Sequence, residues 1–127
     1  MVEPVYLFDL VERQRSYLSA RQALVAQNVA NANSPGYRAV DLAPFTKVLD
    51  QSGLQMSETN SLHVQSAAFD PQAASPKERT AWETTVSGNS VSLEQEMIKA
   101  GEIRGAFSID TSILKAFHGM WMATLKG

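Results

Sequence analysis

One segment constrains the fold more than any other, because an amphipathic helical pattern reaches it and cannot continue through it. Its sequence is Asn28-Val29-Ala30-Asn31-Ala32-Asn33-Ser34-Pro35-Gly36-Tyr37-Arg38. Pro35 lacks the N–H that a helix interior needs, and it pushes the residue before it toward extended geometry. Gly36 can adopt the positive φ that a type II Pro-Gly turn requires. We therefore expect the helix to end near Asn33 and the chain to turn there.

A helical stripe precedes this turn. From about Pro4 to Asn33, apolar doublets recur every seven residues. Pro4 suits a first helical position, and Asp9 can pair with Arg13 one turn later. Polar residues at the same spacing would share the flank of the stripe or interrupt its seam: Gln14, Arg21 and Asn28. The apolar residues that we expect at an assembly interface are Leu10, Val11, Leu18 and Val25.

A second helical pattern follows the turn signal Ser87-Gly88-Asn89 and runs to the last residues of the sequence. Ser92 and Gln95 have the spacing of a capping box. Three glycines interrupt the pattern, and each costs about 1 kcal/mol relative to alanine in a helix interior, so this helix is marginal alone. The residues that we expect at the assembly interface of this helix are Leu93, Met97, Phe107, Leu114, Phe117 and Trp121.

These patterns predict a mainly α fold. Residues 1–33 and 88–127 are expected to pair as an antiparallel, coiled-coil-like unit. Residues 34–87 are expected to connect the helices as a largely irregular, partly ordered segment, not a separate domain. Within it we predict a short helix around Asp41 to Leu49, and the pattern allows short strands at Leu62-His63-Val64 and at Trp82 to Val86.

Composition narrows the class of protein. The chain has 127 residues, enough for one domain, and its net charge of −2 comes from mixed signs without a block of like charge. That distribution argues against a nucleic-acid partner. No apolar run approaches the roughly 18 residues needed to span a membrane. The sequence has no cysteine and no visible secretory signal peptide, so by itself this pattern is typical of a soluble cytoplasmic protein.

The sequence offers no site for catalysis. His63 and His118 stand apart from any metal-ligand, phosphate-loop or nucleophile motif, so packing or solvent exposure is the favoured role of each. Glu94 and Glu96 fall on different helix faces, and helix-start electrostatics is their expected role. We predict no enzyme activity, no catalytic residue, no metal site and no cofactor.

The turn segment resembles the pattern N-x-A-N-x-x-T/S-P-G-Y, which closes the N-terminal helix in the bacterial flagellar axial family of rod, hook and filament subunits. The residues that carry this motif are Asn28, Ala30, Asn31, Ser34, Pro35, Gly36 and Tyr37. Two later runs, Ser87 to Met97 and Phe107 to Phe117, resemble the proximal rod members of the same family. The resemblance therefore covers both ends of the chain, whereas the middle segment matches poorly.

The resemblance implies a structural subunit of the hollow, periplasmic flagellar rod, which serves as drive shaft and export channel. Such subunits leave the cytoplasm through the flagellar type III apparatus without a cleaved signal peptide. The implied partners are other rod subunits, the basal-body adaptor, the membrane ring and the export gate. The alternative is a cytoplasmic coiled-coil adaptor or chaperone-like protein. Either class suits two helices whose apolar stripes need neighbours.

Overall fold

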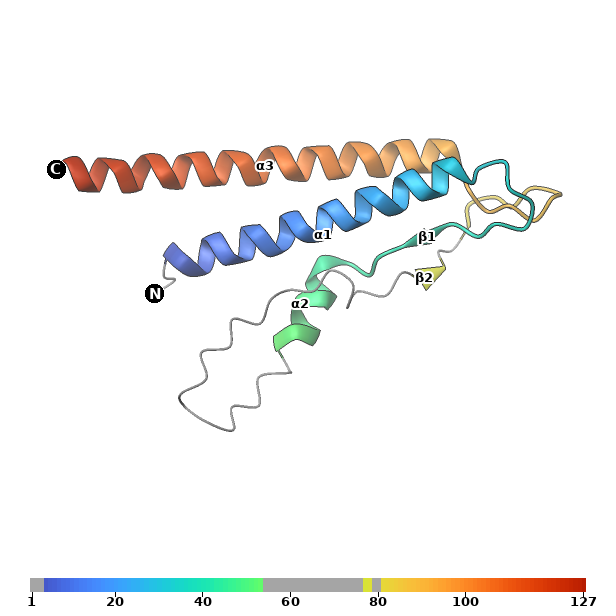
Figure 1. Cartoon of the computed structure of the whole chain (residues 1–127), viewed down its shortest axis with the longest axis horizontal. Coiled ribbons are helices and arrows are strands. Elements are labelled where there is room, and N and C mark those ends of the chain that lie inside the picture. The colour runs from blue at the N-terminus through green and yellow to red at the C-terminus, as the bar shows by residue number, and fades with distance from the viewer. Residues whose placement is uncertain (1–3, 54–76, 79–80) are drawn as a thin grey trace.

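Two long helices dominate the protein. The computed structural model describes residues 4–53, 77–78 and 81–127. In chain order the elements are α1 (Pro4–Ala30), β1 (Val40–Asp41), α2 (Phe45–Gly53), β2 (Lys77–Glu78) and α3 (Leu93–Lys126). α1 and α3 run antiparallel, and α3 continues beyond the N-terminal end of α1 (Figure 1). The mainly α fold with paired terminal helices is confirmed, and the middle of the chain carries one short helix and two short strands.

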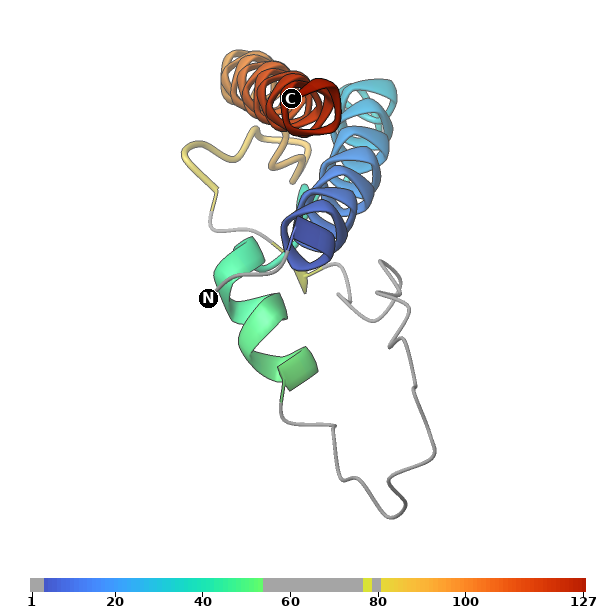
Figure 2. The same ribbon diagram turned by 90° about the vertical axis from the view of Figure 1, so that its left-hand side faces the viewer.

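The core lies around α1, because α3 and α2 pack on different sides of it (Figure 2). The Tyr17 hydroxyl donates to the Ala43 carbonyl at 2.7 Å, and its ring lies 5.3 Å from that of Phe45. β1 and β2 form a two-residue antiparallel ladder that pairs Val40 with Glu78. The buried cluster consists of Tyr17, Leu18, Val25, Leu42, Val48 and Ile103.

The helix ends follow the sequence signals. α1 starts at Pro4, as expected, and ends at Ala30, slightly before the predicted Asn33, because its last bonds tighten to a three-residue spacing. Gly36 has a φ of 72°, and the Tyr37 N–H donates to the Ser34 carbonyl at 3.3 Å. The Pro-Gly turn is therefore confirmed.

The start of α3 shows half of the predicted capping box. The Ser92 hydroxyl accepts a hydrogen bond from the Gln95 backbone N–H at 3.4 Å, and Ser92 has extended backbone geometry. The Gln95 side-chain oxygen is buried without a hydrogen-bond partner among the described residues, so the reciprocal bond is missing. Ser92 alone caps the helix.

The middle segment contains the predicted short helix, but with shifted bounds. The short helix begins at Phe45 instead of Asp41, because Pro44 disfavours helical geometry at the residue before it and Asp41 belongs to β1. Residues 82–86 form no strand. The chain turns there, with the Gly88 N–H donating to the Thr85 carbonyl at 2.8 Å. The extended segment predicted at 62–64 lies outside the described residues.

The apolar stripe of α3 is broader than the face that meets α1. Ile103 is buried and Phe107 is half-buried, whereas Leu93 and Met97 are 53% and 74% exposed. Polar and charged side chains take much of the buried face instead. They are Gln95, Glu96, Lys99 and Asp110.

Candidate functional site

Polar side chains fill the contact between the C-terminal end of α1, β1 and the N-terminal end of α3. We call this region the polar junction. It comprises Arg21, Asn28, Asp41, Asn89, Ser90, Glu96 and Lys99. Burying so many polar groups is unfavourable unless each finds a partner, so their hydrogen bonds decide whether the contact is stable.

Asn28 is fully buried and stands at the centre of the junction. Its amide nitrogen donates to the Val40 carbonyl at 2.8 Å and to a Glu96 carboxylate oxygen at 3.3 Å. Its amide oxygen accepts from the Val40 N–H and from the Tyr37 hydroxyl, both at 3.1 Å. One side chain thus joins α1, β1 and α3 and uses its full hydrogen-bonding capacity.

Asn89 closes the end of α1 from a distant part of the chain. Its amide nitrogen donates to the backbone carbonyls of Asn31 and Ser34, at 2.8 and 2.7 Å. Its amide oxygen accepts from the Val91 N–H at 2.8 Å. Each of these carbonyls also accepts a local backbone N–H, from Ser34 and Tyr37 respectively, so Asn89 adds a second bond to each from a distant part of the chain. The end of one long helix is therefore tied to the start of the other.

Backbone hydrogen bonds join the same two segments. The Gly36 N–H donates to the Ser87 carbonyl at 2.9 Å, and the Ser90 N–H donates to the Tyr37 carbonyl at 3.0 Å. The buried Ser90 hydroxyl accepts from the Ala39 N–H at 2.8 Å. The turn motif and the first of the two later runs that resemble the family thus bind each other directly.

A chain of charges extends the junction. Arg21 donates two hydrogen bonds to the Asp41 carboxylate, at 3.1 and 3.3 Å. The Lys99 ammonium lies 2.8 Å from Asp41 and 3.7 Å from Glu96. Burial raises the pKa of Asp41, but the hydrogen bonds from Arg21 and the adjacent Lys99 ammonium outweigh the effect of burial and hold the pKa below its ordinary value. Asp41 therefore remains a carboxylate that binds both long helices.

The arrangement suits a structural role. Asn28 both donates and accepts hydrogen bonds between the elements, and Arg21 binds the Asp41 carboxylate with two parallel bonds. Together these contacts fix the register and angle between α1 and α3. Within the described residues, no group of three or more His, Cys, Asp or Glu side chains is placed to hold a metal ion. His118 is exposed on α3, and His63 lies outside the described residues.

The predicted motif residues meet in this region. Asn28, Asn31, Ser34, Gly36 and Tyr37 all make junction or turn hydrogen bonds. The remaining two motif residues are exposed: Ala30 and Pro35.

The predicted assembly residues occupy three kinds of position. Val11, Leu18 and Val25 are buried between the elements of one chain. Four others are half-buried between or beside the long helices: Leu10, Phe107, Leu114 and Phe117. The rest are exposed: Leu93, Met97 and Trp121. The rings of Phe8 and Phe117 meet edge to face with centroids 5.4 Å apart. The two long helices therefore also contact each other near the N-terminal end of α1.

Sequence reasoning missed the charged members of the junction. Glu96 was expected only to support the start of a helix, and Lys99 and Asn89 were assigned no contact. The available signal was Arg21 and Asn28, which break the apolar stripe and so require polar partners on the helix opposite.

Asp110 is a second buried carboxylate in the contact between α1 and α3. It is 1% exposed, and one of its oxygens has no hydrogen-bond partner among the described residues. Burial raises the pKa of Asp110, and the nearby Arg15 guanidinium opposes part of that rise.

The described helices include none that is both long enough and apolar enough to cross a bilayer.

Comparison with known proteins finds relatives that share one name. The chain is 38% identical to the flagellar basal body rod protein FlgB of Agrobacterium fabrum, over 98% of this chain and 96% of that protein. It is 31% identical to FlgB of Escherichia coli over 60% of the chain and 61% of that protein. It is 24% identical to FlgB of Proteus mirabilis over 94% of the chain and 93% of that protein. No family model matches.

Proposed function

Because the chain belongs to the FlgB family of flagellar basal body rod proteins, we propose that it polymerises with other rod proteins into the proximal part of the periplasmic rod. It is a structural subunit of the flagellar basal-body rod. The proposal adds its place in that rod, its neighbours and its route of delivery. The observation that carries it is the 38% identity over nearly the whole chain, together with the mutual binding of the turn motif and the segment that leads into α3.

The geometry favours a subunit of a larger assembly over a domain that is stable alone. The polar junction holds one end of the helix pair in a fixed register. Along α3, large apolar side chains remain exposed, including Met97 at 74%, Ile109 at 62% and Trp121 at 51%. So many exposed large apolar side chains on one helix favour association with other proteins. In the proposed rod, neighbouring subunits cover them.

We further propose that the chain is exported unfolded by the flagellar type III apparatus. Its expected partners are other rod subunits and the basal-body adaptor, membrane-ring and export-gate proteins. The predicted assembly residues on α3 would act in the completed rod, and the junction would form after export. A catalytic role forms no part of this proposal. No specific observation favours the cytoplasmic adaptor that the sequence left open.

Deletion and complementation test the proposal. Cells that lack the gene should lose motility and fail to build rods, and a plasmid-borne copy should restore both. A tagged copy should appear in isolated basal bodies only when the export apparatus is intact. Normal rods in the deletion strain would contradict a structural role. Retention of the tagged copy in the cytoplasm, bound to one stoichiometric partner, would favour the adaptor instead.

A further inference from the structure

The outward faces of α1 and α3 differ in charge. Among the exposed residues of α1 there is no Lys or Arg, whereas two are acidic: Asp9, which is paired with Arg13 at 2.9 Å, and Glu12, which has no ion pair with a described residue. On α3, no exposed acidic residue follows Glu102. Three exposed cations there are spaced by eleven residues, about three helical turns, and so form one row along the helix: Arg104, Lys115 and Lys126. None of the three makes an ion pair with a described residue.

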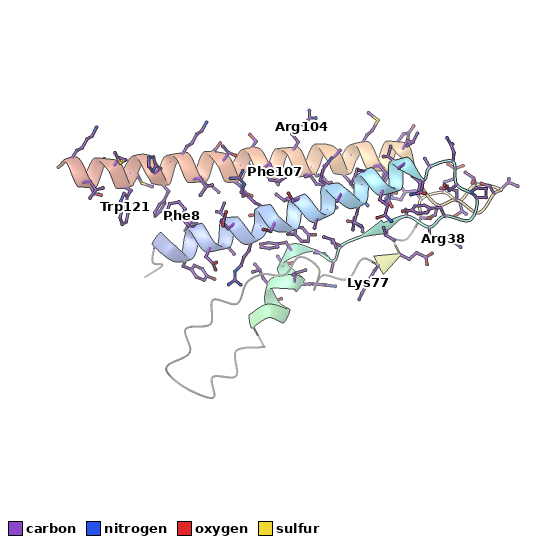
Figure 3. The ribbon with its side chains drawn as sticks, in the orientation of Figure 1. Phe8, Arg38, Lys77, Arg104, Phe107 and Trp121 are labelled. Carbon is purple, nitrogen blue, oxygen red and sulfur yellow. The ribbon has the colours of Figure 1, made fainter. Side chains whose placement is uncertain are left out.

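The cation row points away from the contact within the chain. Figure 3 shows Arg104 directed away from α1, whereas Phe107, one turn later, is directed toward it. Met97 is 74% exposed and falls on the same side of α3 as Arg104. This side, which we call the α3 ridge, therefore carries long side chains: Met97, Arg104, Lys115 and Lys126.

The outward side of α1 carries short side chains where the α3 ridge carries long ones. Its exposed residues include Ser16, Ser19, Ala23, Ala26 and Ala30, which follow one another at helical spacing on one face. Glu12 continues this face toward the N-terminal end of the helix. We call it the α1 back. Long side chains on one helix can pack over short ones on another, so the two surfaces are complementary in shape as well as in charge.

Contacts within the chain fix the relative heights of these surfaces. Phe8 lies against Phe117, and Asn28 is bonded to Glu96, with the two helices antiparallel between these points. Lys115 therefore lies level with the segment of α1 that carries Asp9 and Glu12. By the same correspondence, Met97 lies level with Ala26. Two copies placed side by side in the same orientation would bring opposite charges together at one height, and a methionine over alanines at another.

We propose that the α3 ridge of one copy packs on the α1 back of a second copy, and this inference rests on the proposed rod function. The contact is heterologous, since each copy offers a different face to each neighbour. Contacts of this type generate rings or open helical filaments, which is the geometry that a tubular rod requires. Each exposed ion pair contributes only about 0–1 kcal/mol. Its main effect is to select the height and orientation of the neighbour.

Cysteine cross-linking tests the packing directly, because the chain has no native cysteine. Two single-cysteine variants, Glu12→Cys and Lys115→Cys, are co-expressed in the deletion strain and treated with a short bifunctional thiol reagent. A cross-linked dimer is expected from the mixture and from neither variant alone. A second pair, Ala26→Cys with Met97→Cys, should behave likewise. The control pair Gln27→Cys with Lys115→Cys should give no dimer, since those positions differ in height by about 27 Å at 1.5 Å per residue.

The outcomes separate this inference from the proposed function. Motile cells that show no Glu12–Lys115 dimer would overturn the packing and leave the rod assignment intact. A dimer from Lys115→Cys alone, or a cross-link to a different protein, would overturn it too. Failure of the unaltered chain to restore motility would count against the rod function itself.

Charge exchange gives an independent readout. Lys115→Glu should reduce motility at least severalfold, and Glu12→Lys in the same gene should restore most of it. Both side chains are exposed, so the fold of a single chain should be unaffected by either change. If the double variant were no better than Lys115→Glu alone, the two residues would not be neighbours across the contact.

Discussion

Gly36 and Gly88 lie against each other where the chain leaves α1 and approaches α3. A Cβ atom on Gly88 would stand 3.5 Å from the Cα of Gly36, which is ordinary van der Waals contact. Space therefore does not exclude a side chain at this point. The backbone does, because Gly36 has a φ of 72° and Gly88 a φ of 80°, both in the left-handed region that disfavours other residues.

Gly36→Val should destabilise the chain by about 1–3 kcal/mol, the scale for a bulky residue held in a sparsely populated backbone region. Gly36→Asn is the matched control and should cost much less, since Asn tolerates positive φ. Urea unfolding followed by circular dichroism measures both. Equal stabilities for the Val and Asn variants would show that the turn does not depend on positive φ.

Asn89→Ala should cost about 2–3 kcal/mol, because it removes three hydrogen bonds of a buried side chain: two to the carbonyls of Asn31 and Ser34 and one from the Val91 N–H. The control is Asn31→Ala, which removes an exposed bond to the Gln27 carbonyl and a bond from the Ser34 hydroxyl at 3.2 Å, and which should cost under about 1 kcal/mol. Urea unfolding ranks the two variants. Hydrogen exchange adds a local test, since the Val91 amide should lose protection in Asn89→Ala. A protected Val91 amide would argue against this role of Asn89.

The Asp41 charge cluster predicts a loss of stability in acid. The folded-state pKa of Asp41 lies below its unfolded value of about 3.9, so the unfolded chain binds the proton more tightly. The stabilisation is present in full above that unfolded value and disappears as the pH falls through the folded one. Unfolding free energies between pH 7 and pH 2 should show the loss in the unaltered chain and a weaker dependence in Asp41→Asn. A steeper dependence in the variant would refute the assignment.

The contribution of Asp110 to the free energy of unfolding should depend on pH in the opposite direction. Its folded-state pKa is raised, so the folded chain binds the proton more tightly and loses stability as the pH rises from about 3.9 through the folded value. Asp110→Asn should therefore stabilise the chain at pH 7, by about 1 kcal/mol if the burial of one unpaired group dominates. The gain should vanish near pH 3. An Asp110→Asn chain that is less stable than the parent at pH 7 would mean that the carboxylate has a partner.

Local signals predicted the helix ends well. Pro4, the Pro35-Gly36 pair and Ser92 each act within a few residues of themselves, so their consequences were visible in the sequence. The short helix begins later than the apolar pattern predicts, because Pro44 disfavours helical geometry at the residue before it. Residues 82–86 alternate between apolar and polar side chains but form no strand. A strand also needs a partner strand, and none lies beside this segment among the described residues.

The polar junction could not be predicted because its partners lie far apart in the chain. Asn89 meets Asn31 across 58 residues, and Asn28 meets Glu96 across 68. Hydrophobic periodicity assigns charged residues to the surface, yet Glu96 and Lys99 are buried because the Lys99 ammonium lies between the carboxylates of Glu96 and Asp41. The same periodicity assigned Leu93 and Met97 to the apolar stripe of α3. Within a single chain both side chains are exposed. Their predicted role in assembly remains a prediction.

A side-chain-resolution image of isolated basal bodies tests the central claim most directly, namely that this chain is a rod subunit whose two long helices are tied at the polar junction. We expect proximal rod density that fits α1 and α3 as an antiparallel pair, with the Asn89 side chain against the carbonyls of Asn31 and Ser34. Rods built entirely of other subunits, in cells that express this chain normally, would contradict the claim.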